Sequence, residues 1–249
     1  MASNVCCDGT FFQGDPLDGN VCVLKDLAKE YVKEELKLDD NYMNEQFNIC
    51  YCRVCHKERG DRESYSRGKP PMTYAIPVGW CRFGLKLYTP LEDSFECYYR
   101  AYHGTQPNRV GDVLRTGQLC MPGDVLYTGK ELKELFGHYG ENYGPKGFDY
   151  KRVFVSPSIV YSGYYASPHN WKHYKVQTSF QVLVKPDTFQ KMPETIGATA
   201  AIDKLFSNNE LEWATNIHHA VVLYGLLIKI STHGTYQKEI DQRKKILTR

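Results

Sequence analysis

The spacing of apolar residues predicts one amphipathic helix near the start of the chain. Within residues 16–38, apolar side chains recur every three or four positions, at Val23, Leu24, Leu27, Tyr31, Val32 and Leu36. This period places them on one face of a helix of about four turns. Residues 1–22 are rich in glycine and aspartate, so we expect that segment to be mostly irregular.

Further along the chain, apolar and aromatic runs predict strands at residues 95–102, 152–156, 178–185 and 220–230. Residues 75–87 predict one or two short strands around Gly79. Helical patterns fall near residues 107–117, 158–166 and 197–206, and glycine and proline predict loops at 60–71 and 136–152. Strands this far apart, with irregular connections, indicate an α+β fold rather than a regular βαβ alternation.

A shift in composition at residues 88–93 suggests a boundary between two regions. We expect a small N-terminal appendage over residues 1–92 that contains a helix and a cysteine cluster. Residues 93–232 then form the main domain. Residues 233–249, which end in the run QRKKILTR, form a solvated basic tail.

The composition argues against only a few classes of protein. The 249 residues carry a formal net charge of +2, so nucleic acid is not indicated as a partner. No apolar run is long enough to predict a membrane span, and the first residues do not resemble a secretory signal. We therefore expect an intracellular protein, cytoplasmic or nuclear, whose nine cysteines stay reduced.

One group of cysteines has the spacing of a metal site. Cys50, Cys52, Cys55 and His56 lie within seven residues, and a C-x-x-C turn lets two sulfurs reach one zinc ion. The motif is half complete, and a further ligand must come from elsewhere, with Cys6, Cys7, Cys22 and Cys81 as candidates. Reduced thiols without a special role are the alternative, and covalent haem attachment requires an export signal that the chain does not show. A zinc ion here would stabilise the N-terminal region rather than perform chemistry.

Three other stretches carry side chains suited to catalysis. The first is YHGT, in which Gly104 follows His103 at the end of a predicted strand, so that a ligand could approach the main chain closely. The second is VFVSPSIVYSGYYA, a strand and then a helix that carries Ser162 and Tyr165. The third is NNELEWATN, with a carboxylate just before an aromatic residue. Together they offer a hydrogen-bonding imidazole, a stacking phenol and a carboxylate that could stabilise a cationic sugar carbon.

In order and spacing, these stretches resemble the His-Tyr-Glu ADP-ribosyltransferases, which include the poly(ADP-ribose) polymerases and diphtheria toxin. The matching positions are His103-Gly104-Thr105, then Phe154 with Ser162 and Tyr165, then Glu212-Trp213. The resemblance spans residues 95–231. Separately, CYCRVCHKERGD and AIPVGWCRFGL resemble a segment that precedes a transferase-like region in neuralized-like proteins. The resemblance implies two packed mixed or antiparallel β-sheets with flanking helices.

It also implies roles for individual residues in binding and cleaving NAD. His103 would bind the adenine-side ribose, the Gly104 backbone the nicotinamide amide, and Tyr165 the nicotinamide ring, with Ser162 reaching its amide. Glu212 would bind the nicotinamide ribose as the catalytic carboxylate. Phe154 stands where the family has a first tyrosine, and Tyr161 is the alternative if the alignment shifts. Glu210 is the alternative carboxylate, two residues before Glu212.

The expected activity is therefore cleavage of the nicotinamide–ribose bond of NAD. ADP-ribose would pass to a protein, to the chain itself or to another acceptor, as a single unit rather than a polymer. One alternative is an RNA 2′-phosphotransferase, which needs basic residues around the cleft, and the sequence shows no obvious arginine and histidine cluster there. The other is an interaction module that binds NAD without turnover.

Overall fold

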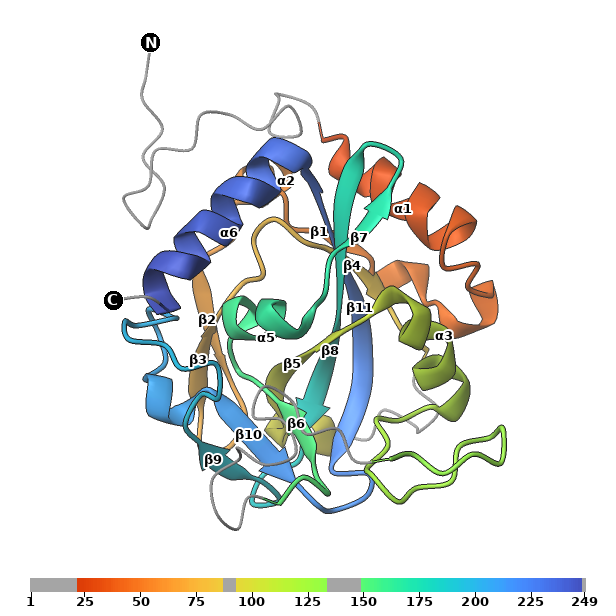
Figure 1. Cartoon of the computed structure of the whole chain (residues 1–249), viewed down its shortest axis with the longest axis vertical. Helices are drawn as coiled ribbons and strands as arrows, with labels where there is room; N and C mark the ends of the chain where they lie inside the picture. Colours follow the sequence, from red (N-terminus) through yellow and green to blue (C-terminus); the bar gives the residue numbers. More distant parts are fainter. Residues whose placement is uncertain (1–21, 87–92, 134–148, 248–249) are drawn as a thin grey trace.

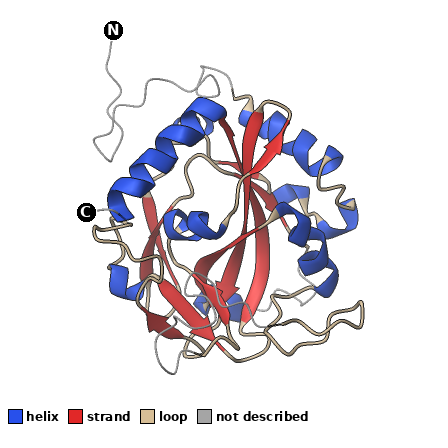
Figure 2. Cartoon of the chain, viewed as in Figure 1, coloured by secondary structure: helices blue, strands red, loops and turns tan. Residues whose placement is uncertain are grey.

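The computed structural model describes residues 22–86, 93–133 and 149–247. Most of these residues form an α+β structure in which a central sheet is flanked by helices (Figures 1 and 2). The predicted irregular segment at 1–22 and most of the predicted loop at 136–152 lie outside the described residues, as does most of the predicted boundary at 88–93.

The larger sheet has six strands, all paired antiparallel, in the order β1–β4–β11–β8–β5, with β7 also paired to β8. Their bounds are β1 Ile49–Cys50, β4 Cys81–Gly84, β5 Tyr99–Thr105, β7 His169–Trp171, β8 Tyr174–Val184 and β11 Val221–Thr232. The two long strands β8 and β11 run through the middle of the molecule (Figure 1). Strand β5 lies at one end of this order.

A smaller antiparallel sheet has the order β6–β10–β9, from Val153–Val155, Glu212–Thr215 and Gln190–Met192. It joins the larger sheet through one bridge, in which Tyr102 and Ser156 exchange backbone hydrogen bonds of 2.7 and 2.9 Å. A separate hairpin pairs β2, Ser64–Arg67, with β3, Met72–Ala75.

Five α-helices are present in the described part of the chain: α1 Leu24–Glu34, α2 Arg53–Arg59, α3 Pro107–Thr116, α5 Ile159–Tyr165 and α6 His233–Leu247. Short 3-10 segments lie at Asp40–Tyr42, Glu45–Phe47, Asp93–Cys97 and Asn208–Glu210. Helix α5 crosses the face of β5 and β8 (Figure 1). No helix among these residues is both long and apolar enough to cross a membrane.

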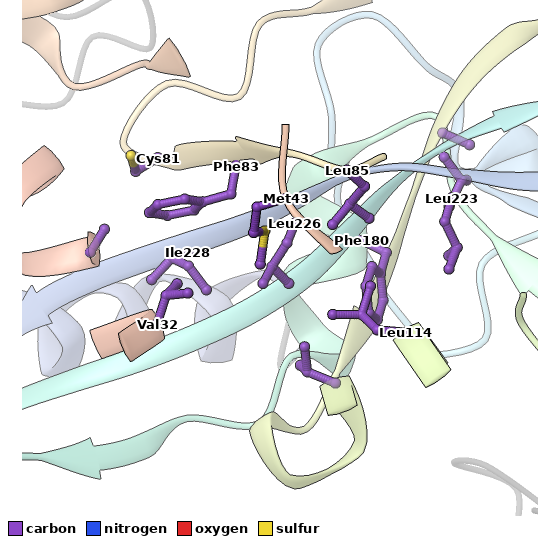
Figure 3. Packing of buried hydrophobic residues seen from close by; sticks show 14 of the residues in the cluster. Val32, Met43, Cys81, Phe83, Leu85, Leu114, Phe180, Leu223, Leu226 and Ile228 are labelled. Carbon is purple, nitrogen blue, oxygen red and sulfur yellow. The ribbon is translucent and has the colours of Figure 1, made fainter. Parts of the chain in front are cut away.

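The main hydrophobic core fills the space between one face of the larger sheet and helices α1 and α3. The apolar face predicted for this helix is confirmed in part: α1 buries Leu24, Ala28, Tyr31 and Val32, whereas Val23 is exposed and Leu27 and Leu36 are half-buried. The four buried residues belong to one cluster with Met43 and Phe83 from the N-terminal region and with Leu226 and Ile228 from β11 (Figure 3).

That shared core corrects the expected separation of an N-terminal appendage from the main domain. Strand β4 lies between β1 and β11 in the larger sheet, so the region before residue 93 contributes strands to the same sheet as β5 and β8. The two regions are therefore built together rather than packed as separate units.

Most of the predicted elements are confirmed, including the strands β6, β8 and β11 and the helices α3 and α5. The predicted strand at 95–102 begins later, at Tyr99, after a 3-10 segment. The predicted loop at 60–71 is wrong in part, because β2 lies within it.

The predicted helix at 197–206 is wrong. In place of helical hydrogen bonds, the Glu194 carboxylate accepts from the amides of Ile196 and Ala198. The Asn208 side chain accepts from Ile202 N and donates to Ala200 O. These side-chain contacts give the backbone an alternative to the helix.

The predicted solvated tail is wrong only in part: residues 233–247 form helix α6, although none of them is buried. Its side chains contact the rest of the molecule: Glu239 pairs with Lys229 at 2.6 Å, and Arg243 donates to Gly163 O at 3.2 Å. Ile246 packs against the second hydrophobic cluster, which contains Tyr74 and Tyr161.

Candidate active site

The imidazole of His103 is half-buried and fixed in one orientation near the end of β5. Its Nδ1 lies 2.8 Å from the carbonyl oxygen of Phe154 on β6. A carbonyl only accepts, so Nδ1 carries the proton in the neutral ring. Burial lowers the pKa of His103, against a smaller opposing effect of the Phe154 carbonyl. The ring is therefore neutral at pH 7, and Nε2 is left as an acceptor for a ligand hydroxyl.

Gly104 is required here because a helix backbone packs directly against it. A Cβ at this position would lie 2.1 Å from Ser162 O and 2.8 Å from Ala166 N. No side chain fits in that space. Close packing of α5 on β5 thus explains the glycine after His103 without any ligand.

The backbone of Gly104 also faces the outer edge of β5. Alternate residues of an antiparallel strand direct their amide and carbonyl groups to the same edge. Tyr102 uses both groups to bond Ser156, on the side away from β8. Gly104, two residues after this bridge, therefore directs its backbone N–H and C=O to the same edge of β5.

Helix α5 is held on the larger sheet by buried polar contacts. Its first turn is capped by Ser158, whose hydroxyl accepts from Tyr161 N at 3.1 Å. The Gln177 amide on β8 donates to Gly163 O and Ala166 O, at 3.1 and 2.9 Å. Ser162 is buried against Ser179, with 3.0 Å between the hydroxyl oxygens. For Ser162 to bond the nicotinamide amide, as the resemblance implies, its contact with Ser179 would have to break.

Two tyrosines of α5 meet the carboxylate of Glu212 at the start of β10. Tyr161 donates to Glu212 Oε2 at 2.8 Å, and Tyr165 OH lies 3.4 Å from the same oxygen. The two phenol oxygens are 2.9 Å apart. Glu212 is only 6% exposed, so this is a buried carboxylate held by neutral donors.

Thr195 completes this network, and the sequence analysis did not identify it. Its backbone amide donates to Tyr161 OH at 2.9 Å, and its hydroxyl donates to Glu212 Oε2 at 3.2 Å. The same hydroxyl lies 2.7 Å from Tyr165 OH. No motif marks this threonine; it lies in the PETIG segment whose turn is fixed by Glu194.

All of the hydrogen bonds that Glu212 makes with described residues reach Oε2. These bonds leave the other oxygen, Oε1, without a hydrogen bond to the part of the chain that the structure describes. Burial raises the pKa of Glu212 above its usual value, although the donors Tyr161, Thr195 and Tyr165 oppose that shift. Burial, together with the nearby carboxylate, also raises the pKa of both tyrosines, so the phenols stay protonated and act as donors.

Glu210 does not share this environment. It is exposed in the 3-10 turn before β10, and its carboxylate pairs with Lys191 at 3.1 Å. Of these two carboxylates, only Glu212 accepts hydrogen bonds from the tyrosines of α5 in the described part of the chain.

Of the remaining candidates, Phe154 contributes its carbonyl to His103, and Tyr161, not Phe154, brings a phenol to the carboxylate. Thr105 is buried, and its carbonyl accepts from Thr178 on β8 at 2.8 Å. Tyr165 therefore contacts Glu212 through its hydroxyl and Gly104 through its backbone, whereas His103 contacts Phe154 on β6.

The N-terminal cysteines form a second cluster. The sulfurs of Cys22, Cys50, Cys52 and Cys55 all lie within 4.8 Å of one another. His56 is outside this group, with its Nδ1 3.3 Å from Asp61. The predicted set of metal ligands is therefore wrong for one residue: the fourth member of the cluster is Cys22, not His56.

A comparison of the chain with the sequence profiles of known protein families finds no match.

The raised pKa of Glu212 predicts a stability difference that depends on pH. Its folded pKa lies above the unfolded value of about 4.3, so the proton is bound more tightly in the folded state. Its contribution to stability is thus present below about pH 4 and is lost as pH rises through the folded pKa. Glu212→Gln should raise the Tm relative to wild type at pH 7, and the difference should vanish near pH 4 in calorimetry.

Glu210→Gln is the matched control, since this exposed residue should give no gain that grows with pH. A Glu212→Gln variant that is less stable than wild type across this whole range would contradict the assigned environment of Glu212.

Proposed function

We propose that this protein is an NAD-dependent ADP-ribosyltransferase. The observation that carries the proposal is the buried carboxylate of Glu212, held through Oε2 by Tyr161 and Thr195 with Oε1 left for a ligand. Two tyrosines and a carboxylate in one hydrogen-bonded group suit cleavage of a glycosidic bond, in which positive charge develops on a sugar carbon.

In the proposed complex, the nicotinamide end of NAD lies along the outer edge of β5. The donor and acceptor of the Gly104 backbone match the carbonyl and amino groups of the carboxamide. The ring of Tyr165 offers a face for the nicotinamide ring. His103 Nε2 accepts from a hydroxyl of the adenine-side ribose, consistent with its neutral state.

The reaction breaks the bond between the ribose C1′ and the nicotinamide nitrogen. The bonding electron pair moves to that nitrogen, so neutral nicotinamide leaves and C1′ becomes oxocarbenium-like. Glu212 stabilises this charge by accepting from the nicotinamide ribose through Oε1. A nucleophile of the acceptor then bonds C1′ and gives up its proton, so that ADP-ribose is attached to a protein, to this chain or to another acceptor. We expect one unit to be transferred rather than a polymer.

We further propose that the four-cysteine cluster holds a structural zinc ion. Zinc binds thiolates at about 2.3 Å in a tetrahedron, which sets neighbouring sulfurs about 3.8 Å apart. The sulfurs of Cys22 and Cys50 are 3.6 Å apart. The amides of Cys52 and Cys55 point at the sulfurs of Cys50 and Cys52, at 3.5 and 3.4 Å, which favours thiolates. The ion would tie Cys22, two residues before α1, to the end of β1 and the first turn of α2.

The activity proposal predicts a separation of binding from turnover. Glu212→Gln keeps the size of the side chain but removes the charge that stabilises the transition state. NAD affinity in calorimetry should stay within a few-fold, whereas nicotinamide release should fall about a hundredfold or more, from about 3 kcal/mol of lost stabilisation.

Glu210→Gln is the control and should retain most of the activity, because its carboxylate pairs with Lys191 and makes none of the contacts of Glu212. If Glu210→Gln abolishes release and Glu212→Gln does not, the carboxylate is misassigned. NAD binding by wild type without release of nicotinamide would favour an interaction module.

The zinc proposal predicts about one equivalent of zinc in protein purified without chelators, by elemental analysis. The double variant Cys52→Ser, Cys55→Ser should lose that metal and unfold at a lower temperature, since structural zinc contributes to folding. Cys120→Ser should keep it, because Cys120 is outside the cluster. Wild-type protein without zinc refutes the proposal.

A further inference from the structure

We propose that Arg82 and Arg100 form a buried site for a phosphate-type oxyanion. The two side chains come from β4 and β5 and are only 3% and 8% exposed. Neither forms an ion pair with a carboxylate in the described part of the chain. Arg82 donates to the Tyr224 carbonyl at 3.4 Å, but a neutral acceptor does not balance its charge. A buried charge without an opposite charge is strongly destabilising, so two guanidiniums beside one tyrosine ring indicate that a counter-ion belongs near them.

The sheet register brings these arginines to opposite sides of a polar row. Across β11, β8 and β5, Gly225 pairs with Gln181, and Gln181 pairs with Tyr102. Arg82 covers the glycine, since its Nε would lie 2.7 Å from a Cβ at position 225. Arg100 precedes Tyr102 by two residues and so lies on the same face of the sheet. The absent side chain of Gly225 leaves the space that Arg82 occupies beside Gln181.

Tyr224 shows that both guanidiniums act at one place. The Cζ atoms of Arg82 and Arg100 lie 4.2 and 5.3 Å from the centre of its ring. Burial by itself would raise the pKa of Tyr224, but the charges of Arg82, Arg100 and Arg67, with a hydrogen bond from Arg82, outweigh burial, and the pKa lies below its usual value. The local potential is therefore positive, as an anion requires.

Several buried polar atoms around these arginines have no hydrogen-bond partner among the described residues. They are the Nε atoms of both arginines, the hydroxyls of Tyr65 and Tyr74, and the amide nitrogen and oxygen of Gln181. Arg100 lies 5.0 Å from the ring centre of Tyr65 and 5.9 Å from that of Tyr74. Buried polar groups are nearly always satisfied, so this concentration points to an occupant.

The chemistry of these atoms selects the class of occupant. The arginine nitrogens can only donate, and the phenols and the Gln181 amide nitrogen can donate as well. The complementary ligand is rich in acceptors and negatively charged. A tetrahedral phosphate offers more oxygens than a carboxylate and suits the planar fork of arginine. The occupant is either inorganic phosphate or the phosphoryl group of a larger molecule.

The test begins with the whole protein purified in a buffer free of phosphate and sulfate. Inorganic phosphate should raise the Tm by several degrees in a saturable way, and sodium chloride at the same ionic strength should not. Native mass spectrometry of protein purified without any step that removes bound ligands distinguishes inorganic phosphate from a larger phosphorylated molecule, because it gives the mass of the ligand that the protein retains.

Arg100→Lys keeps the charge but loses the fork, so its phosphate affinity in calorimetry should fall by about tenfold or more. Arg62→Lys is the matched control at an exposed arginine and should bind as wild type does. Glu212→Gln should also bind phosphate normally, which separates this site from the proposed NAD reaction.

If Arg100→Lys does not fold, the wild-type comparison of phosphate with chloride still decides the question. A wild-type protein that retains no phosphorylated mass and gains no saturable stability from phosphate would show that only water fills the cluster, and the proposal would be wrong. An equal phosphate effect in Arg100→Lys and wild type would also overturn it, since it would reflect a general salt effect.

Discussion

The backbone contact between α5 and Gly104 is the constraint on which the candidate active site depends. With no side chain at position 104, Ser162 O and Ala166 N approach β5 closely enough to exclude even a methyl group. That approach sets the height of α5 above the sheet and turns Tyr161 and Tyr165 toward β10. The Gln177 amide fixes the same helix from below by bonding two of its carbonyls. A longer distance between α5 and β5 would separate the tyrosines from Glu212.

The burial that makes the Glu212 carboxylate costly in free energy also suits it to the proposed reaction. Desolvation disfavours the charged form of Glu212, and three hydroxyls compensate for only part of that cost. Because all three bond Oε2, the carboxylate is fixed in direction with Oε1 left over. In the proposed reaction, this arrangement would stabilise positive charge as it develops on the ribose. The buried arginines of the larger sheet are likewise charged groups without an opposite charge nearby among the described residues, so we propose a ligand at each of the two places.

The sequence pattern predicted those helices and strands whose formation depends on the spacing of their own side chains. The apolar period of α1, the strands β8 and β11 and the helix α5 follow from side-chain spacing, and the α+β class follows from their order. His103 and Glu212 could be singled out because each lies beside a distinctive neighbour in the chain. The helical pattern at 197–206 failed because side chains of Glu194 and Asn208 bond its backbone.

Contacts between distant parts of the chain could not be predicted in this way. Thr195 reaches Glu212 only because β9 and β10 pair, and nothing in its own segment marks it. Cys22 is 28 residues from Cys50, whereas the adjacent His56 is drawn to Asp61 instead. Arg82 and Arg100 both approach the ring of Tyr224, although β11 and β8 lie between their strands β4 and β5.

The measurement that bears most directly on the proposed site is a crystal structure of the protein with a hydrolysis-resistant NAD analogue. We expect the carboxamide on the Gly104 backbone and a hydroxyl of the nicotinamide ribose on Glu212 Oε1. An analogue bound away from β5, with the Glu212 network unchanged and not contacted, would contradict the assignment.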